Sequence, residues 1–224
     1  MDSFLDVVSN YDILGAYWLN IKLTVISGVL ALVLGTVLTL MRISPVGSLR
    51  FAGASYVTLI RNTPLTVIMV FAILVLWPIL GVEFSTNFTV NFFWLAVVAL
   101  TFYHAAFFCE ALRAGVNTVP VGQAEAARAI GLGFVPSARL IIIPQAFRGA
   151  IAPVGNTLIA LIKNTTVAAA ASVQEVSILM GDMIEKHSNY AFPIFLTIAA
   201  GFVVIVIPVG LLTTLLSQRL AVSR

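Results

Sequence analysis

Long apolar runs alternate with short polar segments along the chain. Each run has about 20 residues, the length of an α-helix that crosses the hydrocarbon core of a bilayer. The approximate bounds of the runs are residues 17–41, 57–80, 92–112, 150–172 and 192–217. The pattern predicts an all-α integral membrane protein with five transmembrane helices, folded as a single transmembrane domain over residues 1–224. Pro208 lies inside the fifth run, where we expect a kink in the helix rather than its end.

The charged residues predict which side of the membrane each connection faces. Residues 42–56 carry two arginines and no acid, and the long connection at residues 113–148 carries four arginines and one acid. Cytoplasmic loops are enriched in lysine and arginine, so both connections are expected inside. Residues 1–17 carry three aspartates and no base, which places the N-terminus outside. Five spans then leave the C-terminus inside.

Composition agrees with a membrane protein and gives no sign of an enzyme. Hydrophobic residues make up 60% of the chain and charged residues 9%, with a mean hydropathy of +1.07. The single cysteine, Cys109, excludes an intrachain disulfide and a multi-cysteine metal site, and we expect it to be a packing residue. The sequence shows no glycine-rich phosphate loop, no paired His/Cys ligand spacing and no Ser/His/Asp arrangement. We therefore predict no catalytic residue, no metal site and no nucleic-acid partner.

A polar group interrupts the fourth run. It consists of Lys163, Asn164, Thr165 and Thr166. A lysine inside a membrane costs about 2.5–3.5 kcal/mol unless it has a partner, so a role in function is the first expectation. The alternative is a structural lysine that reaches the interface or caps a carbonyl.

The third run carries ionisable side chains of its own. Glu110 and Arg113 are spaced i, i+3, and we expect them to pair on one face of the helix. His104 is expected to make an interhelical hydrogen bond, with a proton-carrying site as the alternative. His187 lies in a polar connection and is assigned no role.

The long basic connection contains a predicted helix, turn and helix. Pro120 comes before residues 124–130, which are good helix formers, and Gly131 and Gly133 then stop the helix. Pro136 begins a second helical stretch that is expected to run to Pro144. We expect this unit to lie on the cytoplasmic face.

The same segment resembles a known motif. Glu125-Ala126-Ala127, three residues, Gly131, nine residues, Ile141, two residues and Pro144 match the spacing of the EAA loop of ABC-importer permeases. The resemblance extends along residues 17–218 to the five-span permeases of polar amino acid importers, which take up histidine, glutamine, glutamate or arginine. Arg61-Asn62-Thr63-Pro64 is similar to the family's Arg-Gly-Thr-Pro, with Asn62 in place of glycine, and Glu110, Arg113, Lys163 to Thr166 and Glu175 resemble further landmarks. As a whole, the chain resembles the glutamate-uptake permeases of actinobacteria.

The resemblance implies a type I ABC importer. The chain would be its transmembrane permease subunit, a multi-pass protein of the bacterial inner (plasma) membrane that alternates between outward and inward access. Expected partners are two cytoplasmic ATPases that carry ATP and Mg²⁺, an extracytoplasmic substrate-binding protein, and a second permease that is either identical or related; the chain itself would bind no cofactor. The residues implied in ATPase coupling are Gly122, Gln123, Glu125, Ala126, Ala127, Gly131 and Pro144.

The substrate and its path are the least defined expectations. The residues expected to line the path or form its gate are Arg61, Asn62, Thr63, Pro64, Lys163, Asn164, Thr165 and Thr166. No acidic residue is well placed in the spans to pair with a cationic side chain, which favours a neutral or acidic amino acid, such as glutamate, over arginine or lysine. The alternative function is an ATP-independent secondary transporter or channel. An export permease is disfavoured because the EAA loop marks importers.

Overall fold

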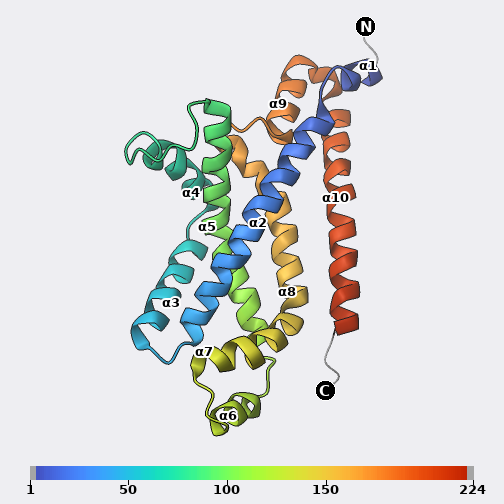
Figure 1. Cartoon of the computed structure of the whole chain (residues 1–224). Helices are drawn as coiled ribbons and strands as arrows, with labels where there is room; N and C mark the ends of the chain where they lie inside the picture. The colour runs from blue at the N-terminus through green and yellow to red at the C-terminus, as the bar shows by residue number, and fades with distance from the viewer. Residues whose placement is uncertain (1–3, 221–224) are drawn as a thin grey trace. The chain divides into compact units, whose positions relative to one another are not determined.

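The computed structural model describes residues 4–220, which form helices joined by short connections (Figure 1). Three helices are each long and apolar enough to cross a membrane: α2 (Ile13–Ile43), α5 (Phe88–Val116) and α10 (Ala191–Leu220). Two bent groups of shorter helices raise the count to as many as five.

The first bent group is α3 (Gly47–Arg61), α4 (Leu65–Phe71) and the π-helix η1 (Ala72–Leu76). The second runs from α7 (Phe134–Ser137) through the π-helix η2 (Ala138–Ile142), α8 (Ile143–Asn164) and the 3₁₀-helix η3 (Thr165–Ala171) to α9 (Val176–Lys186). No strand occurs in residues 4–220, so the all-helical prediction is confirmed.

Two of the predicted runs differ from the helices of the structure. Residues 57–80 are not one continuous helix, because α3 begins at Gly47 and ends at Arg61 before α4 starts. The helical residues before position 57 are amphipathic, with Gly53 and Val57 buried on one face, so a hydropathy average does not detect them. The fourth run is helical well before residue 150, since η2 leads directly into α8 at Ile143.

The chain forms two compact units. The first holds the described residues up to Gly28, together with Leu65–Leu100 and Ala160–Pro208, and the second holds Val29–Pro64, Thr101–Ile159 and the described residues from Val209 onward.

The first unit is held by contacts between helices far apart in sequence. Val7 of α1 (Phe4–Ser9) packs with Met183 of α9 and Ile194 of α10. A second cluster joins Tyr17 of α2 to α9 and α10, and the Tyr17 hydroxyl donates a hydrogen bond to the carbonyl of Ile198. The short helix α4 lies against η3. These contacts join α1 and the first part of α2 to α9 and the first part of α10 in one core.

The second unit depends on small residues where helices cross. A Cβ at Gly35 of α2 would lie 2.8 Å from the Cβ of Phe108 and 3.0 Å from the carbonyl oxygen of Ala105, both on α5. A Cβ at Gly115, near the end of α5, would collide with the carbonyl oxygen of Ala146 on α8. Lipid is as apolar as leucine, so close backbone approach of this kind is a main source of helix association in membranes.

Both π-helices end two residues before a proline. η1 precedes Pro78 and η2 precedes Pro144. A proline cannot donate to the carbonyl four residues earlier, and its ring clashes with that carbonyl. A π-turn, in which each N–H donates to the carbonyl five residues back, widens the helix there; Trp77 N donates to Ala72 O at 3.3 Å in this way. The prolines therefore set the positions of the widened turns. By contrast, α10 continues through Pro208, as predicted.

Glycine-to-alanine substitutions test the close crossing of α5 and α8. We expect Gly115→Ala to destabilise the protein by about 1–3 kcal/mol, because the new methyl group must push backbone aside. Gly181→Ala is the matched control, since it also lies within a helix but has open space around its Cα. It is expected to stabilise by about 0.5–1 kcal/mol through helix propensity. Thermal unfolding in detergent measures both, and equal shifts of the same sign would contradict the crossing.

Candidate functional site

The EAA loop, residues 113–148, contains an exposed helix, α6 (Val121–Ala129), whose start follows Pro120. Gly122, Gln123, Glu125 and Ala126 are exposed. Ala127 is buried, and α6 packs on α7 and η2 (Figure 1). The motif residues therefore divide between an outer face, which carries the Glu125 carboxylate, and an inner anchor at Ala127.

Gly131 makes a turn that requires glycine. Its φ is +81°, in the left-handed region that residues with a Cβ rarely adopt. Its N–H donates to Arg128 O and the N–H of Leu132 donates to Ala127 O, each at 3.0 Å. This pair of bonds is the Schellman motif, which satisfies the last carbonyls of a helix. The predicted helix end at Gly131 is confirmed.

The second helical stretch of the loop extends further than expected. It begins at Phe134 and passes through Pro144 into α8, so the prediction that it ends at Pro144 is wrong. Pro144 is the second residue of α8 and directly follows the widened turn of η2. The second half of the loop is thus part of one uninterrupted run of helix that reaches Asn164.

Large apolar side chains are exposed on this otherwise polar loop. Ile130 is 76% exposed, Val121 72% and Val135 68%. They lie at the two ends of α6 and in α7. Apolar side chains gathered with a charged residue on one exposed element are typical of a surface that contacts another protein.

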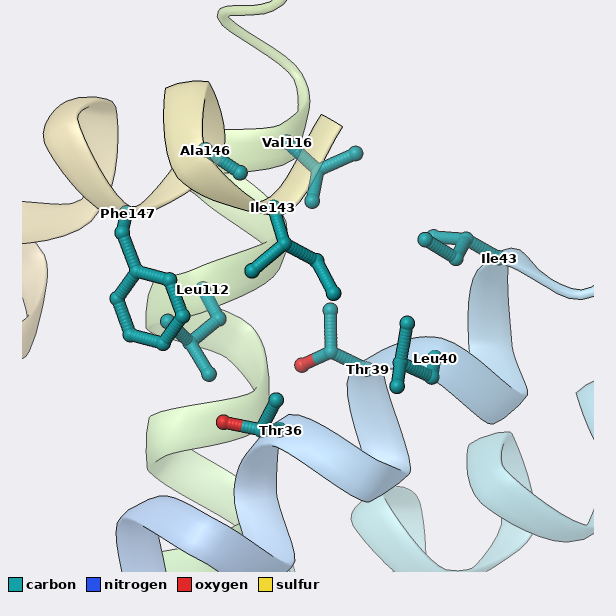
Figure 2. Close-up of a pocket in the computed structure, with 9 residues that line it drawn as sticks. All are labelled: Thr36, Thr39, Leu40, Ile43, Leu112, Val116, Ile143, Ala146 and Phe147. Atoms are coloured by element: carbon teal, nitrogen blue, oxygen red, sulfur yellow. The ribbon is translucent and has the colours of Figure 1, made fainter. Parts of the chain in front are cut away.

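Beside the loop's junction with α8, a small cavity lies among α2, α5 and α8 (Figure 2). Its volume is about 20 Å³, enough for one water molecule. Thr36 and Thr39 supply the lining hydroxyls, and both donate to backbone carbonyls of their own helix. The other lining side chains are apolar, so the cavity is a packing gap and too small for an amino acid. Cys109, on α5, is buried and serves packing, as predicted.

The Arg61 to Pro64 segment closes the end of α3. Asn62 Nδ2 donates to Thr58 O at 2.8 Å, and Thr63 Oγ1 donates to Leu59 O at 2.9 Å. Both side chains therefore cap carbonyls of the last turn, and Pro64 prevents the helix from continuing. Asn62 has φ −91°, which any residue adopts, so the replacement of the family's glycine requires no strain.

The acid of α5 pairs across helices. Glu110 forms an ion pair with Arg42 of α2, and its second carboxylate oxygen lies 3.8 Å from Nη1 of Arg61. Among the described residues, Arg113 is not one of its partners, so the predicted Glu110–Arg113 pair is wrong. The reason is tertiary packing, which brings α2 and α3 alongside the carboxylate. The Arg61 guanidinium also stacks over the Phe107 ring at 5.9 Å.

The polar residues of the fourth run, Lys163 to Thr166, differ in how far they are buried. Lys163 is exposed in the last turn of α8, and its carbonyl accepts a hydrogen bond from Thr166 Oγ1 at 2.8 Å. Asn164 is half-buried. Thr165 is fully buried at the start of η3. Lys163 and Thr165 therefore face different surroundings although they are two residues apart.

Thr165 belongs to a buried polar network in the first unit. Asn20 Nδ2 of α2 donates to Thr165 Oγ1 at 2.9 Å and to Glu175 Oε2 at 3.0 Å. Asn20 Oδ1 accepts from the N–H of Val176 at 3.2 Å. The other oxygen of Glu175 caps α9 by accepting from Ser177 N at 3.0 Å. Glu175, one of the residues that resemble family landmarks, is fully buried.

Sequence reasoning missed Asn20 in this network. The available signal was an amide inside an apolar run, which needs a partner in a membrane. The predicted path residues are themselves divided, with Arg61 to Pro64 in the second unit and Lys163 to Thr166 in the first. Each group is therefore a separate structural feature.

Comparison with known proteins identifies the class of the chain. A family model described as "Binding-protein-dependent transport system inner membrane component" matches residues 27–222. The chain is 48% identical over 217 residues to the glutamate transport system permease protein of Corynebacterium glutamicum, covering 95% of each protein. It is 32% identical over 204 residues to a probable glutamine ABC transporter permease of Bacillus subtilis, covering 89% of this chain and 91% of that protein.

Solved structures agree in fold. A chain in the crystal structure of an amino acid ABC transporter with histidines superimposes with a TM-score of 0.80 at 26% identity, covering 98% of this chain and 99% of that one. The match spans nearly the whole of both chains, so the helical architecture is shared throughout. With a multi-pass helical body, a full-length family match and relatives named as transport permeases, the chain belongs to the inner membrane components of binding-protein-dependent transport systems and is a transport subunit rather than an enzyme.

Proposed function

We propose that this chain is the permease subunit of an ATP-driven importer for a polar amino acid, with glutamate as the first choice. The support is the 48% identity to a glutamate permease, against 32–37% to relatives named for glutamine, cystine or arginine. An acidic substrate is also consistent with the residues proposed for the path, which offer the cations Arg61 and Lys163 and no acid.

The proposed assembly has several partners. Membership of the family implies a substrate-binding protein and an ATPase in general terms. We infer two cytoplasmic ATPases that carry ATP and Mg²⁺, a substrate-binding protein on the outside, and a second permease, identical or related. The chain itself would bind no cofactor. This arrangement requires five spans with the N-terminus outside and the C-terminus inside, which places the basic EAA loop beside the ATPases.

The observation that carries the proposal is the exposed surface of α6 and of the turn that follows it, which carries an acid and two large apolar side chains. Glu125 offers a carboxylate to a partner's basic group, while Val121 and Ile130 offer apolar area that water disfavours. Gly131 holds the turn after α6, and Pro144 lies where the loop continues into α8. Closure of the ATPase dimer would push α6 and move α8 with it, switching the access of the path.

The path and gate are assigned to two segments. Lys163 is the proposed cation for a substrate carboxylate, because it is exposed and has no ion pair among residues 4–220. The hydroxyl of Thr166 donates a hydrogen bond to the Lys163 carbonyl. The hydroxyl of Thr165 accepts one from Asn20 in the buried network. Arg61, Asn62, Thr63 and Pro64 are the proposed gate segment, since they form the end of one helix and the start of the next.

Substitutions in the EAA loop test the coupling role. In a reconstituted complex with its ATPase and binding protein, we expect Glu125→Ala to lower substrate-stimulated ATP hydrolysis and uptake about tenfold, the effect of losing one charged hydrogen bond of roughly 1.5 kcal/mol. Gly131→Leu should do the same, because leucine is strained at φ +81°. Glu83→Ala, another exposed acid, is the control and should leave both rates unchanged. Normal rates in an assembled Glu125→Ala complex would exclude the coupling role.

A cysteine at position 163 tests the path. In a background with Cys109→Ala, Lys163→Cys should react with a water-soluble thiol reagent in at least one nucleotide state, and substrate should slow the reaction. Ala168→Cys is the control, since Ala168 is fully buried and should stay unreactive. The assignment is wrong if position 163 resists reagents from both sides of the membrane in every nucleotide state.

Competition for uptake tests the substrate class. Labelled glutamate should enter proteoliposomes that contain the complex, its binding protein and internal ATP, and excess unlabelled aspartate or glutamine should compete better than arginine. Stronger competition by arginine would contradict an acidic or neutral substrate. Uptake that continues without any ATPase would favour the alternative, an ATP-independent secondary transporter or channel.

A further inference from the structure

An opening in the second unit is lined by three arginines. Its volume is about 370 Å³. Arg42 comes from the last turn of α2, Arg50 from the first turns of α3, and Arg113 from the last turn of α5. The rest of the lining is Gly47, Phe51 and Ala54 of α3. Three arginines from three helices thus line one space, and Arg42 shares Glu110 with Arg61 of the proposed gate segment.

The charge at this opening is not balanced within the described chain. Arg42 is paired with Glu110. Arg50 donates from Nη1 to the carbonyl of Ser44 at 3.3 Å, which leaves its positive charge in place. Neither Arg50 nor Arg113 has an ion pair in residues 4–220. The first turn of α3, at Gly47, adds partial positive charge from backbone N–H groups, and Val46 before it provides no side-chain cap.

The surroundings of the opening are apolar and exposed. Phe51, which lines it, is 75% exposed, and Ala54 lies one turn further along the same face of α3. Arg42 and Arg113 lie in the last turns of the long apolar helices α2 and α5, where a helix that crosses a bilayer would reach the headgroups. A soluble anion would use only the guanidinium groups, whereas a lipid would use the guanidinium groups and the apolar side chains together.

We propose that this opening binds the phosphate group of an anionic phospholipid. Arginine matches phosphate because its planar fork donates two parallel hydrogen bonds to phosphate oxygens. Arg50 and Arg113 hold the phosphate, Arg42 is kept in position by Glu110, and an acyl chain lies along the exposed ring of Phe51. Basic pockets between transmembrane helices are suited to such headgroups. The assignment is independent of the transported substrate, because it concerns lipid binding alone.

The test is lipid retention by the complete permease–ATPase complex, measured by native mass spectrometry after reconstitution in phosphatidylcholine with or without phosphatidylglycerol. We expect wild type to retain phosphatidylglycerol, and the double variant Arg50→Gln/Arg113→Gln to retain about 30-fold less, given the contribution of each arginine near an anionic surface. Arg148→Gln, an exposed arginine of the same unit that does not line the opening, is the matched control and should bind as wild type does. Arg50→Lys/Arg113→Lys should fall in between, because lysine keeps the charge without the fork.

Four results would overturn the proposal. One is equal retention of phosphatidylglycerol by wild type and the double variant. Another is retention of phosphatidylcholine as strong as that of phosphatidylglycerol. Inorganic phosphate that stabilises the wild-type complex in phosphatidylcholine alone, with displacement of the lipid, would assign the opening to a soluble anion. Loss of the ATPase or of a partner permease from the double variant in both lipid mixtures would assign the arginines to a subunit interface. Equal melting temperatures of all variants in phosphatidylcholine would show that the substitutions leave the fold intact.

Discussion

A backbone carbonyl without a hydrogen-bond donor costs several kcal/mol inside a bilayer, and this constraint governs how the helices of this protein bend and end. Pro78 and Pro144 are each preceded by a π-helical turn, in which N–H groups donate to carbonyls five residues back. The end of α3 is closed by the side chains of Asn62 and Thr63. The helix α6 ends in the Schellman bonds around Gly131. At these helix ends, carbonyls without an i+4 donor thus accept hydrogen bonds from nearby groups, and short helices are stable beside the long ones.

Two carboxylates that contact other helices, the partly exposed Glu110 and the buried Glu175, follow the same rule in different ways. Glu110 lies between Arg42 and Arg61, so its charge is balanced by cations from two other helices. Glu175 is fully buried and receives only neutral donors, from Asn20 and Ser177. The first arrangement fixes α2 and α3 against α5 by charge, and the second fixes α9 against α2 by hydrogen bonding. Removing one member of either set would leave a polar group without its partner, which costs more than the bond itself contributes.

The helical class and the turn of the EAA loop could be predicted from sequence because each depends on neighbours along the chain. A long apolar run has few alternatives in a membrane, and a left-handed turn after a helix requires glycine, as at Gly131. The start of α3 could not be predicted from hydropathy, since its residues are amphipathic. The partner of Glu110 depends on how three helices pack, with Arg42 lying 68 positions away. The role of Asn20 depends in the same way on a contact with Glu175.

The hydrogen bond between Asn20 and Glu175 has a consequence for synthesis, because these residues are 155 positions apart. At about 5–20 residues per second, the ribosome adds Glu175 roughly 8–30 s after Asn20. During that interval the first long helix carries an amide whose final acceptor does not yet exist. The packing of α2 is therefore completed only when residues 165–177 have been made and dock beside it. The first long helix to be synthesised is thus one of the last to reach its final surroundings.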